Sequence, residues 1–143
     1  MILKRIEKMD LGALAALECA AFHAPWSEQA LELLCGDGAF GFACMEGTVA
    51  VAYGGMLTVL DEGQITNIAT HPSHRRQGLA ARVMQALLDE ARVRGLAFVT
   101  LEVRESNGAA IALYEKFGFS VLGKRKRFYS NPSEDAFVMG VTL

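Results

Sequence analysis

The sequence predicts a mixed α/β fold, in which one sheet of about seven strands carries about four helices on its two faces. The first observation is that two helical segments are followed by a run of consecutive strands, as in a meander. The second is that the later part of the chain alternates strands with helices. The third is the length of 143 residues, which suits one domain spanning residues 1–143.

The charge and the cysteines exclude several classes of protein. A formal net charge of −2 gives no global field that would draw the chain to nucleic acid or to a membrane. Three cysteines, without a CxxC pair, favour reduced thiols over a disulfide framework or a zinc site. The chain has no apolar run of about 18 residues, and it is charged from residue 4 onward, so neither a membrane span nor a signal peptide is expected. The expected location is therefore cytoplasmic.

The first elements are a short strand and two helices. Residues 2–6 alternate between apolar and polar side chains, as a short strand does. Residues 10–22 have a helical composition with Asp10 as the expected N-cap, and residues 25–36 repeat this arrangement with Ser27.

Three strands are expected next. The stretches FGFACMEG (40–47) and TVAVAYGGMLTVL (48–60) are joined at Glu46-Gly47, a pair typical of a hairpin turn. The third strand is EGQITNIATH (62–71), and the proline that follows it cannot continue the hydrogen-bonded ladder.

The second half of the chain alternates helices and strands. Residues 77–94 form one helical stripe, because apolar residues recur at positions 79, 83, 87 and 91 with Met84 and Leu88 alongside. A strand at 96–104, a helix at 107–118 and two final strands, at 119–130 and 135–143, complete the expected order.

The turn into the third helix, HRRQGLAARV (74–83), is a candidate cradle for phosphate. The first N–H groups of a helix lack partners and carry partial positive charge, so they can bind an anion. Gly78 lets a ligand approach the backbone, Ala80 is nearly as small, and Arg75 and Arg76 add charge. The alternative is an ordinary turn with solvated arginines. The absence of a P-loop and of GxGxxG argues against the common nucleotide-binding classes.

Glu102, in the fifth predicted strand, is the first candidate for a catalytic residue. Alternation places one set of side chains on the same face of this strand: Phe98, Thr100, Glu102 and Arg104. Glu102 lies near the carboxyl end of the strand, where open α/β sheets bind their ligands. Taken alone, it can equally be a carboxylate on a solvated face.

Polar residues around the next helix have two interpretations each. Ser106 and Asn107 are cap-type residues, and Asn107 can either cap the helix or hydrogen-bond a ligand. Tyr114 shares a helical stripe with Ala110 and Phe117, so it can be a core aromatic whose hydroxyl finds a partner, or a catalytic group.

Taken together, RRQGLA (75–80), LEVRESNGAAIALYEKFGF (101–119) and the order of elements resemble the GNAT superfamily of acetyl-CoA-dependent N-acetyltransferases. The pyrophosphate motif of that superfamily is Arg/Gln-x-x-Gly-x-Gly/Ala, and Arg75, Gly78 and Ala80 match it. The resemblance implies a GNAT-like fold with a twisted, mostly antiparallel central sheet.

Further segments are similar to the RimI type within the superfamily, the bacterial N-terminal alanine acetyltransferases of a ribosomal protein. These segments are PWSE (25–28), NIA (67–69), LEVRxSNxxAIxLY (101–114), GF (118–119) and EDA (134–136). The similarity runs nearly end to end. It implies acetyl-CoA as cosubstrate and a protein N-terminus, from a ribosomal protein, as acceptor, with no metal, no membrane and no direct nucleic-acid contact.

The resemblance also implies roles for individual residues. Glu102 would be the general base and Tyr114 the general acid. The residues expected to bind acetyl-CoA are Ile68, Ala69, Thr70, Arg76, Gln77, Gly78, Leu79, Ala80, Ala81 and Asn107. The first three would act through the backbone of a strand that splays away from its neighbour.

The chemistry of acetyl transfer fits these residue types. The acceptor amine must be neutral to attack a thioester, and an α-amino group has a pKa of about 7.7–8 against about 10.4 for lysine. A carboxylate can take the remaining proton, directly or through a water, and a tyrosine hydroxyl can protonate the leaving thiolate. Direct transfer therefore requires no covalent enzyme intermediate.

Two alternative functions remain open from the sequence. One is acetylation of lysine side chains or small amines, and the other is a regulatory module that binds acetyl-CoA without turnover. The basic run KRKR (124–127) is either a solvated face or, with Phe128 and Tyr129, the lining of a peptide groove. Trp26 is either a packing anchor for the second helix or a residue beside the acceptor.

Overall fold

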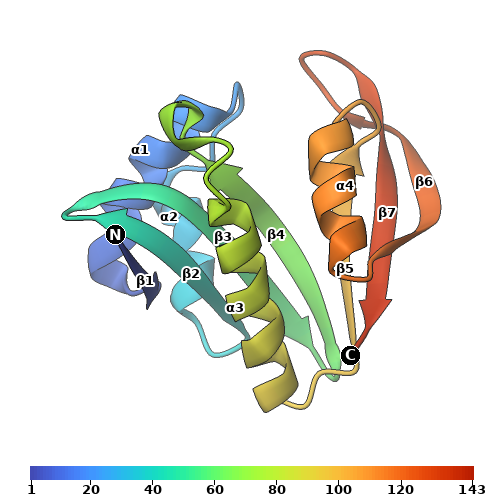
Figure 1. Ribbon diagram of the computed structural model, residues 1–143, viewed down its shortest axis with the longest axis horizontal. Helices are drawn as coiled ribbons and strands as arrows, with labels where there is room; N and C mark the ends of the chain where they lie inside the picture. The colour runs from blue at the N-terminus through green and yellow to red at the C-terminus, as the bar shows by residue number, and fades with distance from the viewer.

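The computed structural model describes residues 1–143 as a seven-stranded sheet with helices on both faces (Figure 1). Its strands lie in the order β1-β2-β3-β4-β5-β7-β6, and every neighbouring pair is antiparallel except β4 and β5. The strands are β1 (Ile2–Arg5), β2 (Ala39–Glu46), β3 (Val49–Val59), β4 (Glu62–Thr70), β5 (Phe98–Arg104), β6 (Ser120–Tyr129) and β7 (Glu134–Thr142). The expected fold class and strand count are confirmed.

Four α-helices and three short 3-10 helices complete the chain. The α-helices are α1 (Leu11–Ala21), α2 (Glu28–Leu31), α3 (Leu79–Val93) and α4 (Gly108–Lys116). The 3-10 helices are η1 (Lys8–Asp10), η2 (Glu32–Cys35) and η3 (Pro72–His74). The second predicted helix, 25–36, is thus one α-helical turn that tightens into η2, and Ser27 caps it by accepting a hydrogen bond from the Ala30 N–H at 3.1 Å.

Asp10 is the N-cap residue of α1, as predicted, but its side chain does not make the capping hydrogen bond. Because η1 comes first, the side chain is directed back, accepts from the Glu7 N–H at 2.8 Å and pairs with Lys4 Nζ at 2.9 Å. Asp10 therefore closes the turn before α1.

Two hydrophobic cores lie on opposite faces of the sheet. One packs α3 and α4 against the sheet and contains the whole predicted stripe of α3: Leu79, Val83, Met84, Leu87, Leu88 and Ala91. The other packs α1, α2 and η2 against β2, β3 and β4, and contains Leu14, Leu17, Leu31, Leu34, Tyr53 and Ala69. In Figure 1, α3 and α4 lie in front of the sheet, and α1 and α2 lie behind it.

The alternation of side chains along β5 determines the face of the sheet from which Glu102, the expected general base, projects. Val99, Leu101 and Val103 are buried in the core with α3 and α4. Glu102 therefore projects from the opposite face, which is the face that α1 and α2 cover further along the sheet.

Candidate active site

The sheet opens between its two parallel strands. β4 and β5 pair only where Glu62–Gln64 faces Phe98–Thr100, and beyond this point the two strands diverge (Figure 1). β4 stays paired with β3 on its other side as far as Thr70. A backbone edge of β4 is therefore left without a strand partner, as a splayed strand requires.

The register of β4 shows which residues direct their backbone into the opening. The His71 N–H donates to the Val51 carbonyl at 2.8 Å, so His71 faces β3. N–H and C=O groups alternate sides along a strand, so Ala69 faces β3 as well. Ile68 and Thr70 therefore direct their N–H and C=O groups toward the opening.

A β-bulge precedes this segment. The pairing between β3 and β4 shifts by one residue between Gly55 and Met56, where Asn67 and Ile65 are the respective partners. The extra residue is Thr66, and its buried hydroxyl makes no hydrogen bond. Such a bulge bends the strand, which turns the end of β4 away from β5.

The turn into α3 leaves several donors free. Gly78 has a left-handed conformation with φ +74°, and the first hydrogen bond of the helix runs from the Arg82 N–H to the Gly78 carbonyl at 3.1 Å. The N–H groups of Leu79, Ala80 and Ala81 donate to no group in the protein. A Cβ atom at Gly78 would meet nothing within 4 Å, so the space beside Gly78 itself is open.

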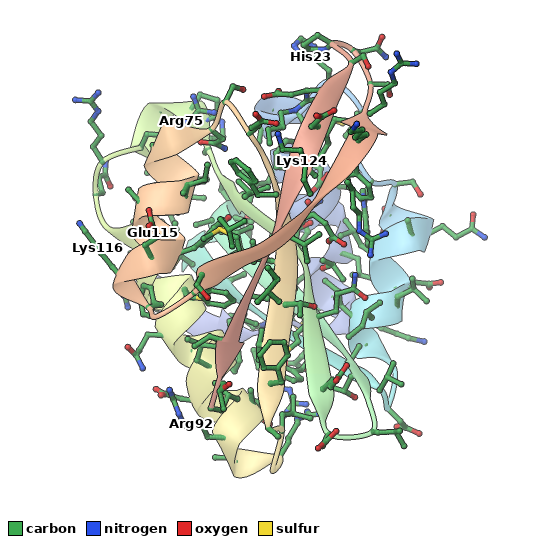
Figure 2. The ribbon with its side chains drawn as sticks, turned by 90° about the vertical axis from the view of Figure 1, so that its right-hand side faces the viewer. His23, Arg75, Arg92, Glu115, Lys116 and Lys124 are labelled. Atoms are coloured by element: carbon green, nitrogen blue, oxygen red, sulfur yellow. The ribbon has the colours of Figure 1, made fainter.

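This turn lies at the end of the molecule where β4 and β5 diverge. Figure 2 places Arg75, His23 and Lys124 at that end and Arg92 at the other. Arg75, Arg76, Gln77 and Gly78 are all exposed. The predicted cofactor residues Ile68, Thr70 and 76–81 thus lie along one stretch of the chain, which leads from the opening to the start of α3. The expectation that Ala69 acts through its backbone is not met, because its N–H and C=O groups face β3.

Glu102 lies half-buried on the face away from α3 and α4. Its side chain is 14% exposed, and its Oε1 is 3.6 Å from Nε of Arg125 on β6. No hydrogen bond holds the carboxylate in the protein, so both of its oxygens can accept a proton or a water.

Tyr114 reaches the same region from the other face. It is 8% exposed, it packs in the core beside Phe119, and its hydroxyl makes no hydrogen bond to the protein. Burial, with a smaller contribution from Tyr129, raises the pKa of Tyr114 to about 12. The expectation that a core tyrosine would find a partner within the chain is therefore not met, and the hydroxyl keeps its proton at neutral pH.

Asn107 caps α4, as one of its two interpretations predicts. Its Oδ1 accepts from the Ala110 N–H at 3.2 Å. The amide NH2 of this exposed side chain makes no hydrogen bond to the protein and remains free to donate.

A cluster of interacting side chains at the end of β5 is not predicted by any pattern in the sequence. The Arg104 guanidinium donates to the carbonyls of Ser130 and Pro132, pairs with Glu134 at 3.2 Å and lies 4.5 Å from the Tyr129 ring centre. Glu134 also accepts from the Ser106 N–H at 2.7 Å. These contacts tie the turn between β6 and β7 to β5.

Tyr129 is brought near both catalytic candidates by this cluster. It contributes to the raised pKa of Tyr114, and Glu102 in turn contributes, after burial, to the raised pKa of Tyr129. The sequence places Tyr129 in only one of two interpretations of the basic run, as part of the lining of a peptide groove. Its proximity to Glu102 depends on the pairing of β5, β7 and β6, which no local pattern shows.

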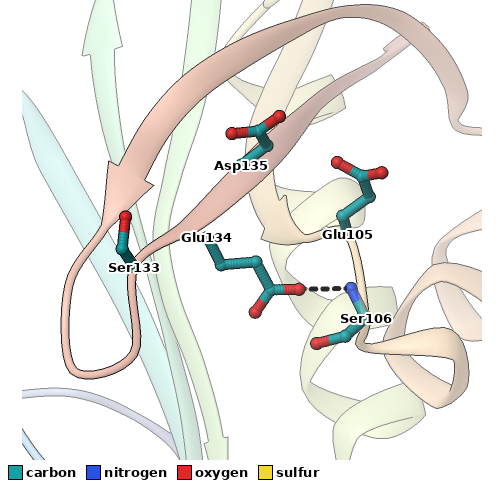
Figure 3. A pocket seen from close by; sticks show the side chains of 5 residues that line it. All are labelled: Glu105, Ser106, Ser133, Glu134 and Asp135. Carbon is teal, nitrogen blue, oxygen red and sulfur yellow. Dashed lines mark hydrogen bonds between the residues drawn. The ribbon is translucent and has the colours of Figure 1, made fainter.

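A polar hollow opens beside this cluster. Figure 3 shows that it is lined by Glu105, Ser106, Ser133, Glu134 and Asp135, and its volume is about 450 Å³. The hydrogen bond from Ser106 to Glu134 crosses it. Hydrogen bonds from Ser106, followed by Arg104, hold the pKa of Glu134 below its ordinary value.

The remaining candidates from the sequence are the three cysteines, the basic run 124–127 and Trp26. Burial raises the pKa of the Cys44 and Cys35 thiols, which disfavours the nucleophilic thiolate, and Cys19 is an exposed residue of α1. The basic run 124–127 is exposed on β6, where Arg125 pairs with Glu102, and Trp26 packs against the core that contains Leu14 and Leu17 of α1. No group of three or more His, Cys, Asp and Glu is placed to hold a metal ion. None of the helices has the length and apolarity needed to cross a membrane.

Comparison with known proteins connects this geometry to a family. The model of the acetyltransferase (GNAT) family matches residues 11–119. The [ribosomal protein bS18]-alanine N-acetyltransferase of Escherichia coli K12 is 37% identical over 140 residues, which cover 96% of this chain and 95% of that protein. The enzyme of the same name from Salmonella typhimurium is 35% identical over 136 residues, with 94% and 92% covered.

A solved structure agrees with the sequence relatives. The crystal structure of the ribosomal-protein-S18-alanine N-acetyltransferase from Escherichia coli superposes with a TM-score of 0.91 at 36% identity, covering 99% of this chain and 92% of that one. The resemblance seen in the sequence motifs is thus confirmed by the family model, the relatives and the fold. This chain belongs to the GNAT family of acetyltransferases.

Proposed function

We propose that the protein transfers the acetyl group of acetyl-CoA to the α-amino group of an N-terminal alanine of a ribosomal protein. The observation that carries the proposal is the opening between β4 and β5, which leaves backbone groups of β4 without a strand partner. Glu102 and Tyr114 are the candidates for the acid–base groups. The names of the full-length relatives supply the acceptor. Such an acceptor favours a cytoplasmic location.

The proposed cofactor side consists of backbone groups. The free N–H groups of Leu79, Ala80 and Ala81, at the positive end of the α3 dipole, suit the pyrophosphate of acetyl-CoA. Arg76 and Gln77 flank them, and the Asn107 amide donates from the start of α4. The Ile68 and Thr70 backbone suits the pantetheine arm, much as an added strand would pair with an open edge.

The proposed reaction uses groups from both faces of the sheet. The neutral amine attacks the thioester carbonyl carbon, and Glu102 takes the amine proton, directly or through a water. A β4 N–H group that points into the opening stabilises the negative oxygen that develops on the carbonyl. The C–S bond then breaks, and the protonated Tyr114 hydroxyl donates its proton as negative charge develops on the departing sulfur, with that proton restored from solvent.

The placement of the two groups suits this order of events. Glu102 lies on the face of α1 and α2, and Tyr114 projects from α4 on the other face. The attacking nitrogen and the departing sulfur occupy different positions on the tetrahedral carbon, so a base and an acid on opposite faces can each reach their own atom. The proposed acceptor therefore enters from the face of α1, α2 and the β6–β7 turn.

The function is tested by incubating the protein with acetyl-CoA and a peptide that begins with alanine, and by following free thiol and peptide mass. We expect stoichiometric thiol and a mass increase on the α-amine. A peptide with a blocked N-terminus and a free lysine is the matched control. Acetylation of the lysine peptide alone would replace the proposed acceptor, and acetyl-CoA binding without product would indicate a module without turnover.

A further inference from the structure

Glu18, in the middle of α1, is a charged-type side chain with no exposed surface. No Lys or Arg forms an ion pair with it. Removing a carboxylate from water is costly unless its oxygens are fully hydrogen-bonded. A leucine, as at the neighbouring position 17, would fill this core at lower cost, so the carboxyl group calls for a specific explanation.

Three donors from three different parts of the chain converge on the Glu18 carboxylate. Oε1 accepts from the backbone N–H of Trp26 at 2.9 Å. Oε2 accepts from the Tyr53 hydroxyl on β3 at 2.5 Å and from the Asn67 amide on β4 at 2.9 Å. One side chain therefore joins the segment between α1 and α2 to two strands of the sheet.

The segment at residues 23–26 depends on this contact. The hydrogen bond from Trp26 to Glu18 is the one hydrogen bond that ties these residues to the rest of the protein. His23, Ala24 and Pro25 are exposed, and only Trp26 is half-buried. Without the carboxylate, the path of this segment would be set by little more than the packing of one indole ring.

The strand contact of Glu18 lies where β4 begins to turn away. Asn67 follows the bulge directly and precedes Ile68. Asn67 shares its face of the sheet with Ala69 and α1, which is the face from which Glu102 projects. Figure 2 shows His23 at the end of the molecule where Lys124 also lies.

We propose that Glu18 is a positioning residue for the acceptor. It holds the 23–26 segment against the bulged part of β4, and so sets the wall that an incoming N-terminus meets on the Glu102 face. This inference rests on the proposed function. It places Glu18 outside the chemistry and away from the backbone donors at the start of α3.

Two variants of Glu18 separate positioning from the structural cost of burial. Glu18→Gln keeps the shape, since its carbonyl can accept from Trp26 and its NH2 can donate to Tyr53 and to a flipped Asn67 amide. Glu18→Leu removes all three contacts. Cys19→Ser, at the exposed neighbouring position of α1, is the matched control.

The test measures KM and kcat for the alanine peptide and, separately, the Kd for acetyl-CoA by calorimetry. For Glu18→Leu we expect the peptide KM to rise about tenfold or more, as loss of a hydrogen bond to a charged group commonly does, with the acetyl-CoA Kd within about twofold. Glu18→Gln should rescue the peptide KM to near that of the wild type. Where Glu18→Leu does not fold, Glu18→Asp replaces it, because a side chain shorter by one methylene cannot reach Trp26 and β4 together.

Three results would overturn the proposal. One is an unchanged peptide KM in a folded Glu18→Leu or Glu18→Asp protein. Another is a parallel rise in the peptide KM and the acetyl-CoA Kd, which would indicate a general structural role. The third is a wild-type protein that acetylates no alanine peptide, in which case the proposed function fails and the positioning role falls with it.

Discussion

The two sides of the opening between β4 and β5 are built in different ways. The proposed cofactor side is one continuous stretch, from Ile68 to Ala81, and it offers mostly backbone groups. The proposed acceptor side is assembled from side chains of separate segments: Glu18, Glu102, Arg104, Tyr129 and Glu134. A backbone site depends on the local path of the chain, whereas a side-chain site depends on strand order. Substitutions should therefore affect the two sides by different mechanisms.

The largest effect is expected at Gly78. A Gly78→Glu substitution adds a carboxylate at the residue that directly precedes the free donors of α3, where it would repel the pyrophosphate. Juxtaposed like charges cost several kcal/mol, so acetyl-CoA affinity should fall by about 100-fold or more. Calorimetric titration measures the loss. Arg75→Ala should only weaken binding, because the backbone carries most of the contact.

Gly95 is a matched control for Gly78. It ends α3 with φ +77°, and a Cβ there also meets nothing within 4 Å. Gly95→Glu introduces the same left-handed strain, about 1–2 kcal/mol, at the opposite end of the helix. It should lower the melting temperature about as much as Gly78→Glu and leave acetyl-CoA binding intact. Equal affinities for the two variants would refute a pyrophosphate site at Gly78.

The next largest effect is expected at Glu102, on the acceptor side. Glu102→Gln removes the proposed base without changing the side-chain shape, so kcat should fall about 10²–10⁴-fold while the acetyl-CoA Kd stays constant. Steady-state rates with the alanine peptide provide the measurement. Glu115→Gln, an exposed carboxylate on α4, should behave as the wild type. If Glu102→Gln kept full kcat, the base would have to be another group.

Tyr114 and Tyr53 are buried on opposite faces of the sheet, so substitutions of the two allow their effects on turnover and on stability to be compared. The Tyr114 hydroxyl has no partner in the protein, so Tyr114→Phe should slow turnover about 10²-fold with little change in stability. Tyr53→Phe removes a donor from the buried Glu18 carboxylate and should cost about 1–3 kcal/mol of unfolding free energy. Thermal melts and kcat of both variants test this. A large stability loss in Tyr114→Phe would make Tyr114 a structural residue.

The smallest effect at neutral pH is expected from tyrosine ionisation. All three tyrosines have a pKa raised by burial, to about 12 for Tyr114, so the folded state keeps protons that the unfolded state releases near pH 10. Their contribution to stability is therefore complete below about pH 10 and is lost as the pH rises toward 12. When the pH is raised, the absorbance of tyrosinate should increase over the same pH range in which the protein unfolds. A tyrosinate signal in the folded protein near pH 10 would contradict this.

The structural features that could be predicted from the sequence are those whose signals are local. Gly78 before an apolar stripe indicates a helix start, and that stripe is buried in full. The alternation in residues 96–104 predicts which face carries Glu102, and the buried pattern of β5 agrees. Asn107 caps α4 as a cap-type residue should. Each of these features involves residues only a few positions apart.

Other features of the structure could not be predicted in the same way. Asp10 is a cap-type residue before a helix, yet a preceding 3-10 turn directs its carboxylate to Lys4. Glu18 reads as a polar residue of an apolar helix, and its partners are 8, 35 and 49 positions away. Tyr129 approaches Glu102 only because β7 lies between β5 and β6 in the sheet.

The sequence by itself determined the periodicities, the helix starts and the glycine in the turn before α3, and with them the fold class and the proposed place of the cofactor. These depend on φ and ψ preferences and on burial along a few consecutive residues. Only the tertiary structure decided how far β4 and β5 separate, which helices cover each face of the sheet, and which carboxylates are buried with partners. The physical reason is that strand pairing and hydrogen bonds between distant segments depend on the whole chain closing around two cores.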